Sequence, residues 1–307
     1  MPKLVNLGSL CIDHVYRVAS LAGPGETIAS QSHQVFPGGK GLNQSLAAAR
    51  AGAEVLHFGC IGSDGQLLID TLSDAGVGTE GIRRLDDQVS GHAVIQVDDS
   101  GANAIVIAGG ANRSVTATDR EAAWMKLNTD DWLLAQNEIN DLEEILTRAR
   151  ALPGRLALNL APVDGREQNY DLAAVDLLIV NEIEARVLVS ADIAAEDDDA
   201  VVGSLAQRYP GMDVVLTAGD RGLVHARGSE RQRLSAHPVA AVDQTAAGDA
   251  FIGYLLAGLL AGVSFTEALE YGSAAGALAV TAPGAASSIP EREAVADLLR
   301  GRSGSRS

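Results

Sequence analysis

The chain has few cysteines, few aromatic residues and an excess of acidic over basic residues. Its 307 residues include two cysteines, Cys11 and Cys60, and aromatic residues make up only 4%. Two isolated cysteines indicate no disulfide framework, and the first residues show no basic, apolar signal region, so we expect a reducing, cytoplasmic compartment. The net charge of −17 argues against the basic face that a nucleic-acid partner requires.

Long apolar runs, histidine pairs and a dinucleotide fingerprint are also missing. The most apolar stretch, 251–263, contains glycines and is too short to cross a bilayer, so no membrane partner is expected. The six histidines form no His-x-x-x-His pair, which argues against a zinc hydrolase. No Gly-x-Gly-x-x-Gly motif follows the first apolar segment, which disfavours an NAD-dependent oxidoreductase.

What the chain does contain is an alternation of short apolar segments with helical patterns. Hydrophobic residues make up 47% of the chain, and with so few aromatics they suit a buried parallel sheet covered by Ala-rich helices. The alternation predicts an α/β fold, a doubly wound, mostly parallel sheet flanked by helices, as one domain over 1–300. Strands are expected at 4–10, 55–61, 132–136, 156–160, 177–180 and 214–217, with an antiparallel edge hairpin at 224–226 and 232–235.

Two segments do not follow this alternation. A strand is expected at 27–36, and two short strands at 92–97 and 104–108 are joined by a hairpin signal, Asp98-Asp99-Ser100-Gly101. The regions near 11–36 and 89–110 are therefore expected to project from the domain as a small β lid. The tail 301–307 contains only Gly, Ser and Arg and is expected to be disordered.

The strongest chemical signal is the stretch Asp243-Gln244-Thr245-Ala246-Ala247-Gly248-Asp249-Ala250-Phe251. A turn of small residues that opens a helix leaves backbone N–H groups free to bind an anion. A carboxylate in that same turn, Asp249, supplies a base, and phosphoryl transfer needs both functions. The alternative is a tightly packed helix start that merely carries an acid in its first turn.

A second signal is the Gly-rich stretch Pro37-Gly38-Gly39-Lys40-Gly41-Leu42-Asn43-Gln44. Its glycines would let a ligand approach the backbone, Lys40 supplies positive charge, and Asn43 offers both a donor and an acceptor. It differs from a phosphate-binding Walker A sequence, which is longer and ends in Gly-Lys-Ser/Thr. An ordinary strand-to-helix turn with a solvated lysine is the alternative.

Two further motifs follow expected strands. Asn181 and Glu184 would share a face at a helix start, where they suit a water-mediated contact to Mg²⁺ or, alternatively, a simple helix cap. The segment Thr217-Ala218-Gly219-Asp220-Arg221-Gly222 would wrap the phosphates or ribose of a nucleotide, or would simply enter a hairpin. Because ligands of open α/β sheets bind at the carboxyl ends of strands, these residues are expected to meet there.

Taken together and in order, these motifs resemble the PfkB family of carbohydrate kinases, and within it the ribokinase group. Gly38-Gly39-Lys40-Gly41-x-Asn43-Gln44 is similar to the sugar-side motif, and Val242-Asp243-x-x-Ala246-Ala247-Gly248-Asp249 to the second family signature. Gly109-Gly110-Ala111-Asn112 and Asn159-x-Ala161-Pro162 also fit. The resemblance extends over almost the whole chain and implies a ribokinase-like fold.

The resemblance implies a role for each matching position. Asp249 is the expected catalytic base, with Ala246, Ala247 and Gly248 as the anion hole for the transferring γ-phosphate. The positions that match sugar-binding residues are Asp13, Gly39, Lys40, Asn43, Glu138 and Asp249. The positions that match the ATP site are Asn181, Thr217, Gly219, Gly222, Gly248 and Ser273, with Glu184 as a water-mediated ligand of Mg²⁺.

Ribokinases also carry a monovalent-cation site, usually for potassium, beside the anion hole. The matching positions are Asp243, Thr245, Ala279, Ala282, Gly284 and Ser288. Several of these would contribute backbone carbonyls from two loops, and such oxygens suit a large, weakly hydrated cation. A K⁺ ion bound there would order the anion-hole turn without taking part in the chemistry.

The implied activity is ATP-dependent phosphorylation of a primary hydroxyl, most readily of D-ribose to D-ribose 5-phosphate, by a homodimer joined through the lid. Cys11 stands where ribokinases usually have Asn, and loss of that amide would change which sugar is preferred. The alternatives are a PfkB-type kinase for another sugar or a nucleoside, and a catalytically silent sugar-binding protein on the same fold.

Overall fold

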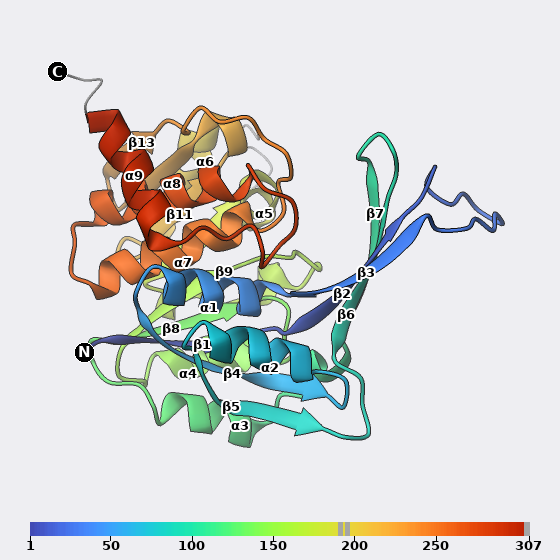
Figure 1. Ribbon diagram of the computed structural model, residues 1–307. Coiled ribbons are helices and arrows are strands. Elements are labelled where there is room, and N and C mark those ends of the chain that lie inside the picture. Colours follow the sequence, from blue (N-terminus) through green and yellow to red (C-terminus); the bar gives the residue numbers. More distant parts are fainter. Residues whose placement is uncertain (190–192, 194–196, 304–307) are drawn as a thin grey trace.

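The computed structural model describes residues 1–189, 193 and 197–303, and its centre is a nine-stranded sheet (Figure 1). All neighbouring strands pair in parallel except at the β11–β12–β13 edge, where pairing is antiparallel. The strand order is β13 (Glu230–Leu234), β12 (Leu223–Arg227), β11 (Asp213–Thr217), β10 (Leu177–Asn181), β9 (Arg155–Asn159), β8 (Trp132–Gln136), β1 (Lys3–Leu7), β4 (Glu54–Gly62) and β5 (Gly78–Leu85). This confirms the expected mostly parallel sheet and its antiparallel edge hairpin.

Helices cover both faces of this sheet. One face packs against α1 (Lys40–Arg50), α2 (Gln66–Asp74), α7 (Ala247–Leu260), α8 (Phe265–Ala279) and α9 (Arg292–Ser303). The other face packs against α3 (Ala117–Trp124), α4 (Leu142–Ala149), α5 (Glu182–Leu188) and α6 (Asp198–Arg208). Alternate residues of β1 point to opposite layers, with Leu4 in the first core and Val5 and Leu7 in the second. Such a two-sided core is what makes these strands continuously apolar.

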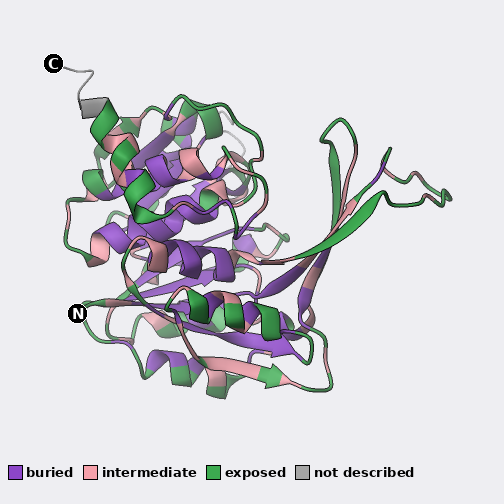
Figure 2. Cartoon of the chain, viewed as in Figure 1, coloured by how far each residue is buried: buried purple, intermediate pink, exposed green. Residues whose placement is uncertain are grey.

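A second, four-stranded sheet projects from the domain, and we call it the lid. Its order is β3 (Ser32–Gly38), β2 (Cys11–Arg17), β6 (Gly91–Val97) and β7 (Asn103–Ala108). The outer part of the lid is exposed, whereas the strands of the main sheet are largely buried (Figure 2). The two segments that broke the strand–helix alternation therefore lie side by side in one sheet, as expected.

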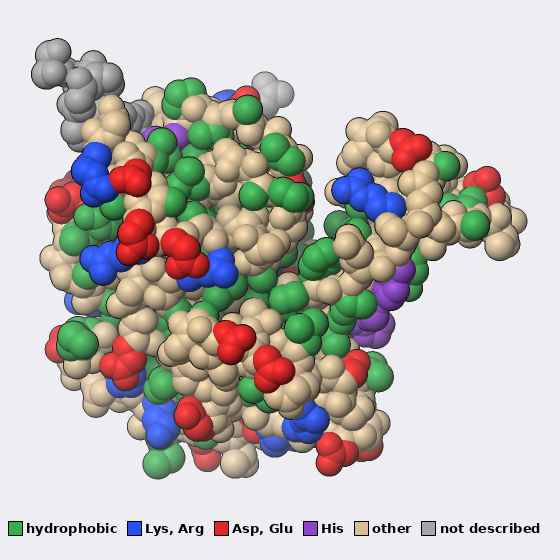
Figure 3. Space-filling model, in the orientation of Figure 1, with side chains coloured by type: hydrophobic (Ala, Val, Ile, Leu, Met, Phe, Trp, Pro, Cys, Tyr) green, Lys and Arg blue, Asp and Glu red, His purple; other side chains and the backbone are tan. Residues whose placement is uncertain are grey.

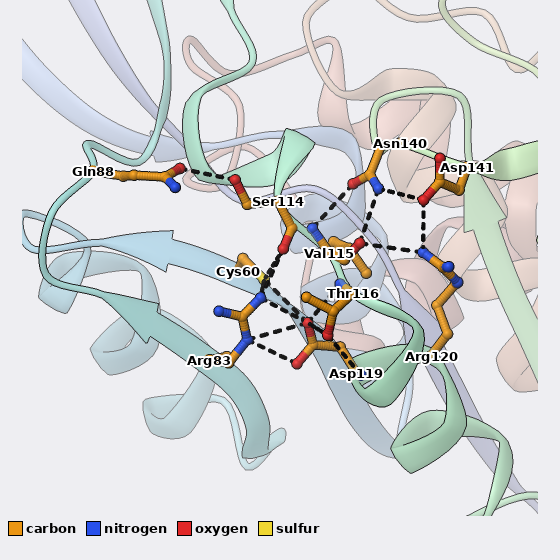
Figure 4. Close-up of polar contacts among 10 residues, drawn as sticks. All are labelled: Cys60, Arg83, Gln88, Ser114, Val115, Thr116, Asp119, Arg120, Asn140 and Asp141. Atoms are coloured by element: carbon orange, nitrogen blue, oxygen red, sulfur yellow. Dashed lines mark hydrogen bonds and ion pairs between the residues drawn. The ribbon is translucent and has the colours of Figure 1, made fainter.

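The chain leaves the lid after β7 through the short helix η1 (Gly110–Arg113). The residues directly after η1 make polar contacts that fix this end of the lid to the domain (Figure 4). Arg83 pairs with Asp119 at 2.8 Å and also donates to the Ser114 carbonyl at 2.7 Å and the Cys60 Sγ at 3.5 Å. Burial raises the pKa of the Cys60 thiol to about 11. Cys60 is therefore an unreactive packing residue, and Cys11 is likewise a free, buried thiol.

The strand expected at 27–36 begins only at Ser32. Besides this, the structure corrects three boundaries. The Gly-rich turn is shorter than expected, because β3 continues to Gly38 and α1 begins at Lys40. Gly39 alone reverses the chain, with a φ of 93° that favours glycine. Asp13 lies inside β2 and not in a connection after the first strand.

The third correction concerns the C-terminal end. Helix α9 extends through residues 301–303, which we expected to be part of a disordered tail, while 304–307 lie outside the described residues. Val295 and Leu298 of this helix pack against the core. Across the described ranges, no helix is both long and apolar enough to span a membrane.

Candidate active site

Asp249 lies in the first turn of α7, where it is 7% exposed and held by two side-chain amides of α1. The Asn43 Nδ2 donates to its Oδ2 at 3.0 Å, and the Gln44 Nε2 donates to its Oδ1 at 2.9 Å. Both carboxylate oxygens therefore accept one amide hydrogen bond, and each keeps a lone pair for a further donor. This geometry brings the two strongest sequence motifs, around 37–44 and 243–251, into direct contact.

The turn before Asp249 has the backbone geometry of an anion-binding site. Ala246 caps α7 in the left-handed region, with a φ of 59°, which is unusual for a residue other than glycine. The hydrogen bonds of this turn use the N–H groups of Ala247 and Ala250, and no described acceptor bonds those of Gly248 and Asp249. A Cβ built on Gly248 would meet nothing within 4 Å, so space for a ligand lies directly against these donors.

Asp13, Lys40 and Glu138 gather where the lid joins the domain. The Lys40 backbone N–H donates to the Glu138 Oε2 at 3.1 Å, and the Ser9 hydroxyl donates to the same oxygen. Burial, with the nearby charge of Glu138, raises the pKa of Asp13 to about 6. The pKa of Lys40 is also raised: burial alone would lower it, but the carboxylates of Asp249, Glu138 and Glu184 outweigh that effect.

One buried acceptor at this junction has no partner among the described residues. The Asn43 side chain is 5% exposed, and its Oδ1 has no hydrogen-bond donor, although its Nδ2 binds Asp249. An unpaired buried acceptor is costly. A substrate hydroxyl that donated to this oxygen would remove that cost, so the residues present fit a polyhydroxylated ligand bounded by Asp13, Gly39, Asn43, Glu138 and Asp249.

A pocket of about 470 Å³ opens on the other side of the α7 turn. It is lined by five of the residues expected to bind the nucleotide: Thr217, Gly219, Gly222, Gly248 and Ser273. Gly222 has a φ of 89°, and a Cβ there would lie 2.0 Å from the Leu234 carbonyl oxygen, so only glycine fits this turn. Asn181, the sixth expected residue, is not among the residues that line the pocket.

Much of the lining of this pocket is apolar. It includes Val239, Phe251, Ala277 and Val280, with Ser273 as a polar group. An apolar slot with few polar groups suits a flat heteroaromatic ring. The pocket therefore combines the free backbone donors at Gly248 with apolar surface, and a nucleoside triphosphate needs both.

Asn181 and Glu184 form the cap of α5. The Asn181 Oδ1 accepts from the N–H groups of Ile183 and Glu184, and both Glu184 oxygens accept from Asn181, at 2.9 Å and 2.8 Å. The helix-cap interpretation is thus confirmed. Burial raises the pKa of Glu184, against the lowering effect of the Asn181 hydrogen bonds and of Lys40.

Asn181 and Glu184 could contact Mg²⁺ only if water and phosphate oxygens supplied most of its ligands. No cluster of three or more His, Cys, Asp or Glu side chains that would hold a metal occurs in the described part of the chain. Mg²⁺ keeps several waters and needs only one or two protein carboxylates when phosphates supply the rest. Glu184, with a free lone pair on each oxygen, fits such a water-mediated contact.

Asp243 ties together the two loops that contain the expected cation-site residues. Its Oδ1 accepts from the Thr245 N–H and hydroxyl, at 2.9 Å and 2.6 Å, and its Oδ2 accepts from the Gly284 N–H at 2.9 Å. The pKa of Asp243 is lowered: burial acts to raise it, but these hydrogen bonds outweigh that effect. Of the other expected residues, Ala279 ends α8 and its carbonyl accepts from the Ala282 N–H at 3.3 Å, while the Ser288 hydroxyl donates to the Ala285 carbonyl at 3.0 Å. The Asp243 carboxylate therefore joins the loop before α7 to the loop that contains Gly284.

Two contacts of the site were not anticipated from sequence. Gln44 stands in the Gly-rich motif, but nothing in the sequence indicated that it binds Asp249. Ser9 ends up on Glu138 because Gly8 and Gly41 let the turn after β1 pack tightly against α1. The position of Ser9 just after a buried strand was the one feature of the sequence that could have indicated a role in the site.

Cys11 is buried beside the sugar-side residues. The Asn112 Nδ2 donates to its Sγ at 3.4 Å and to the Leu10 carbonyl at 2.9 Å. Burial, with the charges of Glu138 and Asp13, raises the pKa of the Cys11 thiol, so it is neutral. A neutral thiol is a weak partner for a hydroxyl.

Comparison with known proteins agrees with this geometry. The family model described as pfkB family carbohydrate kinase matches residues 1–292. The ribokinase of Haemophilus influenzae is 35% identical over 300 residues, covering 96% of this chain and 98% of that protein.

Solved structures show the same likeness. A ribokinase from Thermotoga maritima has a TM-score of 0.86 at 33% identity, covering 98% of this chain and 100% of that one. An Arabidopsis thaliana ribokinase, solved as a complex with ribose and ATP, has a TM-score of 0.86 at 28% identity, covering 97% and 99%. The chain belongs to the PfkB family of carbohydrate kinases.

Proposed function

We propose that this chain is an ATP-dependent sugar kinase that transfers the γ-phosphate to the primary hydroxyl of D-ribose, giving D-ribose 5-phosphate. The observation that carries the proposal is the position of Asp249. It lies between the unpaired Asn43 Oδ1 on one side and the free N–H groups and pocket beside Gly248 on the other. The similar ribokinases support ribose as the acceptor.

In the proposed mechanism, the sugar binds beneath the lid between Asp13, Asn43 and Glu138. Asp249 accepts the proton of the attacking hydroxyl while that oxygen forms a bond to the γ-phosphorus and the bond to the β-phosphate oxygen breaks. The free N–H groups of the α7 turn bind the phosphoryl oxygens as their charge develops. Mg²⁺, when bound with ATP, supplies charge neutralisation at the phosphates.

The neighbouring groups have supporting roles in this proposal. Lys40 lies within the electrostatic reach of Asp249, Glu138 and Glu184, so it balances the negative charge that gathers around the phosphates. A K⁺ ion between the Asp243 and Gly284 loops would hold the α7 turn in place. Closure of the lid would exclude water and limit hydrolysis of ATP.

We also propose that the chain forms a homodimer through the lid. Val35, His14, Val94 and Val106 are directly opposite one another across β3, β2, β6 and β7, so their side chains share one face. Val106 is 70% exposed, and histidine side chains are visible on the part of the lid nearer the main domain (Figure 3). The three valines of this row expose apolar surface, which favours burial against a second copy.

The test is a panel of acceptors with Mg²⁺-ATP and K⁺, measuring ADP release from the wild type and from Asp249→Asn. We expect ribose to be preferred over 2-deoxyribose, fructose, other pentoses and nucleosides. The Asp249→Asn variant should lose about a hundredfold or more in kcat with an unchanged circular dichroism spectrum. Preference for another acceptor would contradict ribose as the substrate but not the kinase activity. Cys11→Asn, which restores the residue usual in ribokinases, would then be the first variant to make.

Silence of the wild type on the whole panel would instead favour the sugar-binding protein. Thermal unfolding distinguishes the two cases. A kinase should be stabilised by sugar and by nucleotide, whereas a binding protein should respond to sugar alone.

A further inference from the structure

A chain of buried polar side chains runs from Asp249 into the core, and its members come from α7, α1, β8, β1 and β4. It passes through Gln44, Gln136, Asn6 and Ser45 to His57, all of which are fully buried. The Gln44 Oε1 accepts from the Gln136 Nε2 at 2.8 Å, and that nitrogen also donates to the Asn6 Oδ1 at 3.0 Å. The Asn6 Nδ2 then donates to the Ser45 Oγ at 2.8 Å.

The contacts of this chain fix the orientation of each amide. The Gln44 Nε2 has two acceptors, the Asp249 Oδ1 at 2.9 Å and the Asn159 Oδ1 at 3.1 Å, so its oxygen must face Gln136. Because Ser45 accepts from Asn6, its hydroxyl proton is directed to the His57 Nδ1, 2.8 Å away. Burial lowers the pKa of His57 to about 4, so the ring is neutral and able to accept.

Burying these amides costs desolvation free energy that an apolar core of the same volume would not require. The polar chain is therefore expected to serve a function. Its one ionised end is Asp249. At that end, Asn43 holds one carboxylate oxygen and Gln44 holds the other. Two donors on separate oxygens fix the rotation of the carboxylate plane, which a single donor would leave free.

We infer that Gln44 is a positioning residue that aims Asp249 at the acceptor hydroxyl, and that Gln136 holds Gln44 in the orientation this requires. The inference rests on the proposed function, because it assigns Gln44 a part in the reaction that Asp249 catalyses. A small misplacement of a base reduces the rate far more than it reduces substrate binding. Gln44 should therefore act on kcat and not on the KM of the sugar.

The first test is Gln44→Met, which keeps the side-chain length but removes the donor. Using the acceptor that the wild type prefers, we expect kcat to fall about ten- to a hundredfold while the KM of the sugar stays within about twofold. An unchanged kcat, or a raised KM with normal kcat, would overturn the inference.

The second test is Gln44→Glu, because a carboxyl that contacts the base changes the pH dependence of kcat, whereas one placed away from the base does not. A second carboxyl beside Asp249 disfavours ionisation of the pair, so the acid limb of kcat against pH should move up by about one pH unit. The matched control is Asn137→Asp, another fully buried amide, whose Nδ2 donates to the Pro162 carbonyl and the Glu167 carboxylate and whose Oδ1 accepts from the Tyr170 hydroxyl. A carboxyl there would couple to Glu167 and not to Asp249. Its acid limb should stay where the wild type has it.

The outcomes separate this inference from the proposed function. A wild type that phosphorylates ribose, together with Gln44 variants of normal kcat and normal pH profile, would overturn the inference alone. A wild type that phosphorylates a different acceptor would remove ribose, and the two Gln44 tests would proceed with that acceptor. A wild type that phosphorylates nothing would overturn both. If Gln44→Glu does not fold, Gln44→Met decides the question.

Discussion

The Asp13 carboxylate lies so close to the backbone of Gly38, across the β2–β3 pair, that a Cβ at residue 38 would be 2.1 Å from the Asp13 Oδ2. The Asp13 carboxylate thus occupies the space that a side chain at residue 38 would need. The contact joins the first lid strand to the Gly-rich motif that enters α1. The position of Asp13 therefore depends on both β2, which contains it, and β3, which ends at Gly38.

Gly38→Ala is therefore expected to displace Asp13 and to raise the KM of the sugar about tenfold or more, since a lost buried hydrogen bond to a charged group costs about 1.5–3 kcal/mol. The KM of ATP should stay the same, because the nucleotide pocket lies on the other side of the α7 turn. Steady-state kinetics with each substrate varied in turn checks this. Equal sugar KM values in the variant and the wild type would contradict it.

The sugar KM should also depend on pH near the raised pKa of Asp13, about 6. Above this value Asp13 is ionised and accepts hydrogen bonds from sugar hydroxyls, so the KM should be low; below it the acid is protonated and the KM should rise. Kinetics between pH 5 and 8 measures the effect, and Asp13→Asn should give a flat profile in the same range.

Stability should respond to Asp13 in the opposite sense. Because the folded-state pKa is raised, the folded chain binds a proton that the unfolded chain releases between about pH 6 and the usual value near 3.9. The Asp13 contribution should therefore become more favourable as the pH falls through this window. The unfolding free energy of Asp13→Asn should lack that dependence, so the difference between the two proteins should change with pH across this window. A pH-independent difference would contradict the prediction.

Gly248→Ala tests the anion hole. The added Cβ would meet no protein atom within 4 Å, so the melting temperature should change little. The methyl group would instead occupy the space beside the free N–H groups, and kcat should fall about a hundredfold, as expected when an oxyanion donor is obstructed. A variant with normal kcat would show that the phosphoryl group lies elsewhere.

Potassium is expected to raise the rate above that in sodium at equal ionic strength. The reason is that the loops joined by Asp243 and Gly284 lie beside the α7 turn and offer oxygens suited to a large cation. ADP release in KCl and in NaCl measures this, with Asp243→Ala as the variant that should lose the difference. Equal rates of the wild type in the two salts would remove the cation site.

The proposed dimer gives a test with a matched control. Val106→Asp places a charge in the exposed row of the lid and should produce a monomer in size-exclusion chromatography with light scattering. Ile105→Asp changes the next residue of β7, which is also exposed but points to the opposite face. It should leave the oligomeric state unchanged, and a wild type that is itself a monomer would refute the dimer.

Much of the main sheet was predictable because its strands are short apolar runs. The expected strand at 132–136 coincides with β8, and those at 156–160 and 214–217 differ from β9 and β11 by one residue. Strand β5 was missed, since its sequence Gly-Thr-Glu-Gly-Ile-Arg-Arg-Leu is polar and rich in glycine. As an edge strand with one neighbour, it needs no continuous apolar run.

The sequence by itself determined the fold class, the family and the residue types of the site, because these follow from apolar periodicity and from motifs local in the chain. The tertiary structure decided which groups meet. Gln44 and Asp249 are 205 positions apart, and no local pattern indicates that α1 and α7 pack with these side chains facing each other. That contact depends on the register of buried layers, which only the packed core specifies.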